Sequence, residues 1–228
     1  MSAPGSGGRS ETPEGAVRQP RPAGVRVAGM VFTRRELVDL LAAWVALGVA
    51  FTAFLFTPQV FLSEVLVFAL SVSMATVGVG FLLHELAHKV VAVRYGQVAH
   101  FQADYGMLFV AIMAGLAGFL FAAPGAVVHR GRITPREHGL IALAGPVTNL
   151  LLAALFVPLV FVPAVGPIAH LGVTINAFLA AFNMIPFGPL DGKTVLNWSK
   201  AVFAVAFLVS AGSVATLYYT VGFGIFGL

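Results

Sequence analysis

A His-Glu-x-x-His sequence, His84-Glu85-Leu86-Ala87-His88, lies inside a long apolar run of the chain. On a helix, residues four apart share one face, so His84 and His88 can bind one Zn²⁺ through their imidazole nitrogens. Glu85 lies about 100° further round the helix, where it can act as a general base toward a water molecule without ligating the metal. A chance pair of histidines is the alternative, but three ionisable groups together in an apolar run argue against it.

Two histidines leave a zinc ion short of protein ligands, and the chain has no cysteine to supply another. Asp191 is the best candidate, because it lies in a stretch with two prolines and two glycines, 186–192, where a helix should break and let the carboxylate turn inward. A loop carboxylate beside Lys193 is the alternative interpretation. The remaining histidines are weaker candidates, since we expect them in polar loops, at segment edges or near a membrane interface: His100, His129, His138 and His170.

The composition places these residues in a membrane protein. Of 228 residues, 59% are hydrophobic and only 10% are charged, whereas about 25% charged residues are usual in a soluble domain. A soluble fold of this size could not bury so much apolar surface. We also expect no nucleic-acid partner, because no basic stripe marks a folded face.

Six apolar runs follow an N-terminal segment, 1–27, that is rich in Gly, Pro, Ser and Arg and is expected to be a disordered tail. The expected membrane domain is 28–228. The second run is about 45 Å long if it is wholly helical, more than a hydrocarbon core of about 30 Å, so it must tilt, kink or project. The runs lie at about 37–57, 65–95, 107–123, 138–162, 167–186 and 198–223.

The sidedness of the charges indicates that the third run, 107–123, does not cross the bilayer. Arginines before the first run place the N-terminus in the cytoplasm by the positive-inside rule. A crossing third run would put Arg130, Arg132 and Arg136 outside, whereas a re-entrant element keeps them inside and brings Asp191 to the membrane depth of the histidines. We therefore expect an all-α polytopic membrane protein with five crossings and one re-entrant element, and a plain six-helix bundle is the alternative.

Three sequence elements taken together resemble the site-2 protease family of intramembrane zinc metalloproteases. They are His84-Glu85-x-x-His88, Gly145-Pro146-Val147-Thr148-Asn149 and Asn183-x-x-Pro186-x-x-x-Leu190-Asp191-Gly192. The similarity covers about residues 65–195. No insertion is large enough for the PDZ domain of some members, so the chain resembles the compact type, with 28–228 as its transmembrane metalloprotease domain.

The resemblance implies one Zn²⁺ per chain, held by His84, His88 and Asp191, with Glu85 activating water. It implies that Asn183 stabilises the carbonyl oxygen or the substrate backbone. Asn149 is a weaker candidate for the same duty, and an interhelical hydrogen bond is the alternative for it. The resemblance further implies a core of three transmembrane helices, here runs two, four and five, and a membrane-embedded β-hairpin, which would be the re-entrant run.

The implied activity is hydrolysis of peptide bonds within or near transmembrane segments of other membrane proteins, which would be partners together with the lipid bilayer. The enzyme would lie in the cell membrane, with its N-terminus and active site toward the cytoplasm; its oligomeric state stays open. Two other classes compete with this interpretation. A non-catalytic zinc-binding membrane protein would not need Glu85, and a metal transporter would have ionisable residues strung across the bilayer rather than gathered at one depth.

Overall fold

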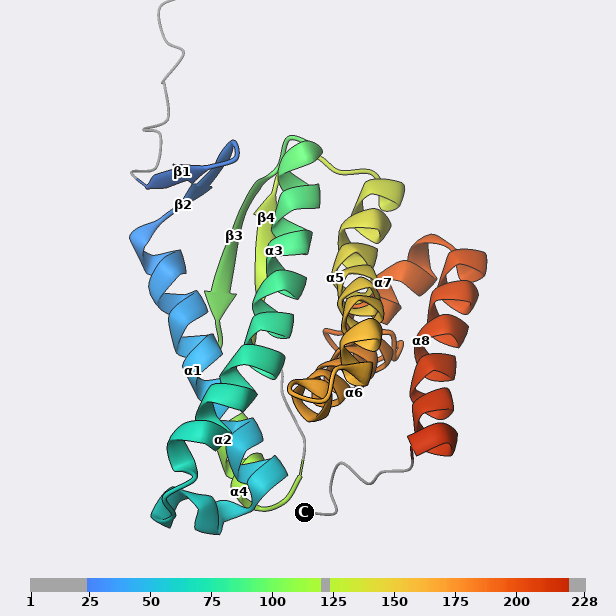
Figure 1. The fold of residues 1–228 in the computed structure, drawn as a ribbon. Helices are drawn as coiled ribbons and strands as arrows, with labels where there is room; N and C mark the ends of the chain where they lie inside the picture. The colour runs from blue at the N-terminus through green and yellow to red at the C-terminus, as the bar shows by residue number, and fades with distance from the viewer. Residues whose placement is uncertain (1–23, 120–123, 222–228) are drawn as a thin grey trace, which may run out of the picture.

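The computed structural model describes residues 24–119 and 124–221, and helices dominate it (Figure 1). Two short antiparallel hairpins complete the described part, one at its N-terminal end and one beside the long central helix. In chain order the elements are β1 (Val25–Val27), β2 (Met30–Phe32), α1 (Arg34–Phe56), a 3₁₀ turn (Pro58–Leu62), α2 (Leu66–Ser73), a π-helical turn (Met74–Gly78), α3 (Val79–Arg94), β3 (Val98–Ala103), α4 (Tyr105–Leu116), β4 (Gly125–Arg130), α5 (Pro135–Phe156), a second 3₁₀ turn (Val157–Phe161), α6 (Gly166–Asn183), α7 (Asp191–Trp198) and α8 (Lys200–Val221).

Four helical segments are long and apolar enough to cross a membrane, and they mark the chain as an integral membrane protein. They are Arg34–Phe56, Leu66–Arg94, Pro135–Phe161 and Lys200–Thr220. The mostly helical fold expected from the sequence is therefore confirmed. The fifth expected crossing, α6, has 18 residues and is not among these four, so the count of five or six crossings stays a prediction.

Regular structure begins inside the segment that the composition assigned to the tail. Val25–Val27 pairs with Met30–Phe32 in an antiparallel hairpin. Its turn residues, Ala28 and Gly29, both have positive φ angles, 48° and 80°, as a two-residue hairpin turn of this twist requires. The first strand therefore begins before the expected tail boundary at residue 27, because valines on both sides of this turn pair as strands. Residues 1–23 lie outside the described part of the chain.

The apolar run 107–123 is helical over most of its described part, and the structure corrects the expectation that this run is itself the hairpin. Asp104 caps the N-terminus of α4 by accepting a hydrogen bond from the Met107 amide at 3.0 Å. Methionine, leucine and alanine, which favour helices, make up much of the run that follows. Residues 120–123 are not among those described.

The expected β-hairpin exists, but its strands flank the run instead of lying in it. β3 and β4 pair antiparallel along their whole length, from Val98 opposite Arg130 to Ala103 opposite Gly125. The hairpin lies between α1 and α3, whereas α5, α6, α7 and α8 follow on the other side of α3 (Figure 1). A strand pair therefore covers one side of the helix that carries the His-Glu-x-x-His sequence.

The segment from α2 to α3 runs without interruption through the π-helical turn. The Trp44 indole on α1 packs where a side chain at Gly78 would have to lie. Its N–H donates to the Met74 carbonyl oxygen at 3.0 Å. An apolar core that includes Phe51, Phe81 and Phe101 also joins α1, α3 and β3. These contacts fix α3 against α1 one turn before the sequence that carries the chemistry.

The packing of α4 against α1 depends on Gly115, because a Cβ there would overlap the backbone of Ala50. Gly115→Ala should therefore lower the free energy of unfolding by about 1–3 kcal/mol, seen as a lower melting temperature in detergent. Gly212→Ala on α8 is the control, since a Cβ there has no neighbour within 4 Å. Equal melting temperatures for both variants would contradict the packing of α4 on α1.

Candidate metal centre and active site

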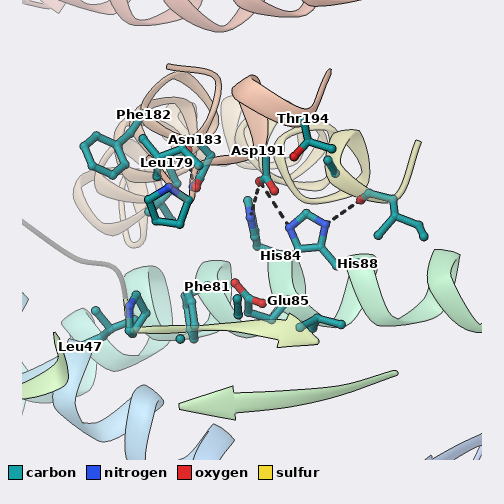
Figure 2. A pocket seen from close by; sticks show the side chains of 18 of the residues that line it. Leu47, Phe81, His84, Glu85, His88, Leu179, Phe182, Asn183, Asp191 and Thr194 are labelled. Atoms are coloured by element: carbon teal, nitrogen blue, oxygen red, sulfur yellow. Dashed lines mark hydrogen bonds and ion pairs between the residues drawn. The ribbon is translucent and has the colours of Figure 1, made fainter. Parts of the chain in front are cut away.

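Two imidazoles and one carboxylate converge where α3 meets α7 (Figure 2). The Nε2 atoms of His84 and His88 lie 3.2 Å and 3.4 Å from Oδ2 of Asp191. Both histidines are buried, at 4% and 7% exposed. The structure thus brings together the three residues that the sequence named as candidate zinc ligands.

A break between two helices delivers Asp191 to this place. α6 ends at Asn183 and α7 begins at Asp191, as the prolines and glycines between them predicted. Gly188 takes a positive φ of 58° in the connecting turn, and a Cβ at Gly192 would overlap the backbone of Met184. The chain therefore folds back tightly and presents the first residue of α7 to the histidines.

Hydrogen bonds on the far side of each imidazole decide which nitrogen carries the proton. Nδ1 of His88 lies 2.7 Å from the Ile141 carbonyl oxygen, and Nδ1 of His84 lies 2.6 Å from Oδ1 of Asn149. Both partners accept hydrogen bonds, so each Nδ1 is the donor and each neutral imidazole keeps a lone pair on Nε2. Such support for the second nitrogen is typical of histidines that bind metals.

The arrangement fits a zinc ion by the chemistry of its donor atoms. Two Nε2 lone pairs and a carboxylate oxygen face one another, and the structure shows no hydrogen-bond partner for that oxygen. Electron-rich atoms in a buried place need positive charge among them, from protons or from a cation. Gly145 of α5 leaves the space open, since a Cβ there would overlap Nε2 of both histidines. Two histidines and one carboxylate are a known ligand set for catalytic zinc.

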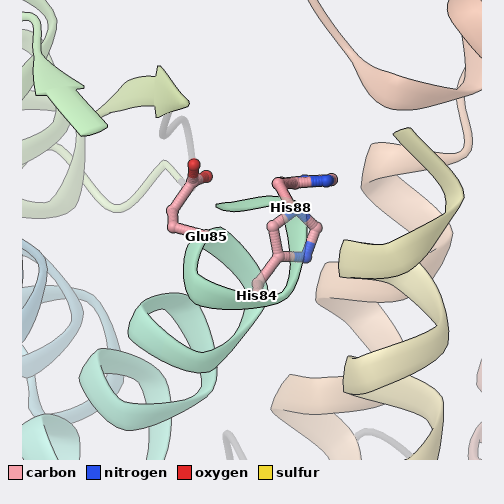
Figure 3. A group of neighbouring side chains, drawn as sticks. All are labelled: His84, Glu85 and His88. Carbon is pink, nitrogen blue, oxygen red and sulfur yellow. The ribbon is translucent and has the colours of Figure 1, made fainter. Parts of the chain in front are cut away.

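Glu85 borders the same place from the neighbouring face of α3. One oxygen of its carboxylate and a nitrogen of each histidine lie within 4.8 Å of one another. Figure 3 shows that its side chain leaves the helix toward the hairpin, whereas His84 and His88 point toward α5. Glu85 is 6% exposed, and its Oε2 has no hydrogen-bond partner among the described residues. A carboxylate with a free oxygen beside the site is suited to accept a proton.

A cavity of about 230 Å³ opens onto these groups. Helices α1, α3, α5, α6 and α7 line it together with β4, and most of its wall is apolar (Figure 2). His129 of β4 and His138 of α5 also line it, with their ring centroids 5.4 Å apart. Burial lowers the pKa of His129, and the neighbouring imidazoles of His138 and His88 add to this effect. Neither residue joins the cluster of zinc-ligand candidates.

Asn183 lines the cavity on the last turn of α6. Its Nδ2 donates to the Leu179 carbonyl oxygen at 3.0 Å, which holds the amide against its own helix. This bond uses one of the two N–H groups of the amide. The side chain therefore borders the cavity, and its expected contact with a substrate stays a prediction.

Asn149 faces His84 instead of the cavity, and the substrate-binding duty expected for it does not fit. The residue is fully buried, and its Oδ1 is occupied by the histidine. Its Nδ2 donates to the Gly80 carbonyl oxygen at 3.2 Å and to Oδ1 of Asn176 at 2.9 Å. All these hydrogen bonds of Asn149 are made inside the protein, and one of them orients the zinc-ligand candidate His84. This agrees with the alternative interpretation, an interhelical hydrogen bond.

Asn176 of α6 is a residue that the sequence analysis missed. It is fully buried and donates to the Gly172 carbonyl oxygen at 2.9 Å while accepting from Asn149. This contact fixes which end of the Asn149 amide faces His84. An amide in the middle of an apolar helix was the available signal, because such a group needs a partner.

Comparison with known proteins finds relatives of matching length. The chain is 40% identical over 187 residues to MJ0611 of Methanocaldococcus jannaschii, provisionally named a zinc metalloprotease; the match covers 79% of this chain and 93% of that protein. It is 33% identical over 144 residues to YwhC of Bacillus subtilis, which bears the same provisional name; this match covers 54% of the chain and 66% of that protein. No protein-family model and no solved structure matches the chain.

Removal of Asp191 should weaken zinc binding. We expect Asp191→Ala to lower the affinity at least about tenfold, because the metal loses its only carboxylate ligand, as measured by competition with a chelator on purified protein. Thr194→Ala is the control, since Thr194 lines the same cavity one turn further along α7. Undiminished affinity in Asp191→Ala would remove Asp191 from the ligand set.

The two asparagines should differ in the same assay. Asn149→Ala removes the partner of His84 Nδ1 and should lower zinc affinity about 10- to 100-fold. Asn183→Ala leaves both histidines supported and should bind zinc as tightly as the unchanged protein. Equal zinc affinities for the two variants would show that Asn149 does not orient His84.

Proposed function

Because the chain belongs to a family of zinc metalloproteases, we propose that it hydrolyses peptide bonds within or near the transmembrane segments of other membrane proteins. The observation that carries this proposal is the place of the His-Glu-x-x-His sequence. It lies on α3, in one of the four segments that are long and apolar enough to cross a membrane. A protease built this way meets its substrates in the bilayer, which agrees with the resemblance to site-2 proteases.

We assign the zinc ion to His84, His88 and Asp191, and the general base to Glu85. The bound zinc supplies a Lewis acid that polarises the scissile carbonyl and makes water a better nucleophile. Glu85 takes the proton of the attacking water with its unpartnered oxygen and later passes it to the leaving amine. Asn183 donates to the carbonyl oxygen as negative charge develops there.

A membrane-spanning substrate has to unwind before attack, because its peptide carbonyls are hydrogen-bonded within its helix. An unwound segment needs new partners for those groups in the same apolar place. β4 lines the cavity and lies beside Glu85 (Figure 2). A substrate strand added to this edge would satisfy its own backbone and lie in reach of the base.

For the topology we propose five crossings, with α6 as the fifth and with the N-terminus and active site toward the cytoplasm. α4 has 12 residues, about 18 Å of helix, which is short for a hydrocarbon core of about 30 Å. An α4 that enters and returns keeps Arg130, Arg132 and Arg136 on the cytoplasmic side, as the positive-inside rule requires.

Glu85→Gln tests the mechanism. The variant should bind zinc normally but cleave at least about 100-fold more slowly, because an amide cannot take the proton from water. A model transmembrane helix with glycines near its cytoplasmic end, placed between two soluble tags, serves as substrate in detergent, and cleavage is followed on gels. Glu64→Gln, an exposed residue in the first loop, is the control. Full activity of Glu85→Gln would overturn the assignment.

A further inference from the structure

Two carboxylates near the start of α1 are buried, although the proposed chemistry does not use them. Glu36 is 1% exposed and Asp39 is 3% exposed. Lys89 of α3 donates to Glu36 at 2.5 Å and to the Val31 carbonyl oxygen at 2.8 Å. It also lies 3.7 Å from the centroid of the Phe32 ring. Buried ion pairs contribute little stability over apolar replacements, so the contacts of these carboxylates indicate what they do.

Both carboxylates accept hydrogen bonds from the backbone of β3. Glu36 Oε1 accepts from the Phe101 amide at 3.0 Å, and Asp39 Oδ2 accepts from the Ala103 amide at 3.4 Å. Asp39 Oδ1 also accepts from the Tyr105 hydroxyl at 2.7 Å. An open sheet edge offers such amides to any added strand. Here two side chains, three residues apart on a helix, occupy the place of that strand.

The register shows which peptide groups β4 leaves open. Because the amides of Phe101 and Ala103 point to α1, their partners Val127 and Gly125 form pairs without hydrogen bonds across the hairpin. The peptide groups of Val127 and Gly125 therefore point away from β3. In Figure 2, β4 lies between β3 and Glu85, so its outer edge is the one beside the site. One edge of the hairpin is filled by α1, and the other faces the cavity, where the Val127 backbone amide points to the Glu85 carboxylate.

We propose that Glu36 and Asp39 are positioning residues that hold the outer edge of β3 and so fix the open edge of β4 beside Glu85. An extended substrate then meets a strand edge that α1 does not cover on the side of the base, where it would take the Val127 amide over from Glu85. Lys89 neutralises the charge of Glu36 and connects this carboxylate to α3, at the residue that directly follows His88. The inference rests on the proposed function where it names a substrate, but the hold of α1 on β3 can be tested without one.

Two neutral double variants separate the hold on β3 from the burial of charge. Glu36→Gln/Lys89→Met keeps an acceptor oxygen for the Phe101 amide, whereas Glu36→Leu/Lys89→Met removes it, and both delete the ion pair. In the leucine variant we expect the Phe101 amide to exchange with solvent at least about tenfold faster. We expect kcat/KM for the model transmembrane helix to fall about 10- to 100-fold relative to the glutamine variant. Zinc content should be equal in both.

Equal amide exchange and equal cleavage in the two double variants would overturn the proposal. Asp39→Asn and Asp39→Leu make the same comparison at the Ala103 amide and decide the matter if a Glu36 variant does not fold. Faster exchange with unchanged kcat/KM per folded molecule would reduce the carboxylates to a stabilising role and also overturn it. If the unchanged protein cleaves no transmembrane helix, the proposed function fails, while the exchange rates still decide whether α1 holds β3.

Discussion

Inside an apolar helix bundle, three electron-rich atoms face one another: Nε2 of His84, Nε2 of His88 and Oδ2 of Asp191. The surrounding helices hold these three atoms in place. Positive charge must lie among them, and the place must stay open for it. α5 prepares the place for that charge, because its acceptors bind each Nδ1, which leaves the Nε2 lone pairs free, and its Gly145 leaves the space open. The break before α7 then brings the carboxylate against the two imidazoles.

Polar groups in an apolar surrounding need partners, and this need connects the elements around the site. Asn149 joins α3, α5 and α6 through one amide. Glu36 and Asp39 join α1 to the hairpin, and Lys89 extends that connection to α3. Each contact is costly to leave unmade. The position of the histidines, the base and the strand edge is therefore set by directional bonds in addition to apolar packing.

Much of the site could be predicted from the sequence, because its signals are local and rare. Few carboxylates enter the apolar runs, so Glu85 and Asp191 were visible, and the Pro-Gly stretch marked the break that positions Asp191. The hairpin was expected but misplaced, since the apolar run 107–123 showed no strand pattern and the pairing residues lie in the less apolar segments beside it. The duties of Asn149 and Asn176 depend on contacts between residues far apart in sequence, which no local pattern shows. The same is true of Glu36 and Asp39, whose partners are backbone amides.

The π-helical turn at Met74–Gly78 sets the rotational phase of the active site. A π turn holds one residue more than an α turn, and each residue of an α-helix turns the next side chain by about 100°. The first half of this segment, α2 with the π-helical turn, packs on α1. The extra residue in the turn rotates α3 relative to that half, and so it sets which neighbouring helix His84 and His88 face. A chain that lost one residue here would keep every motif intact and still direct its two imidazoles away from α5.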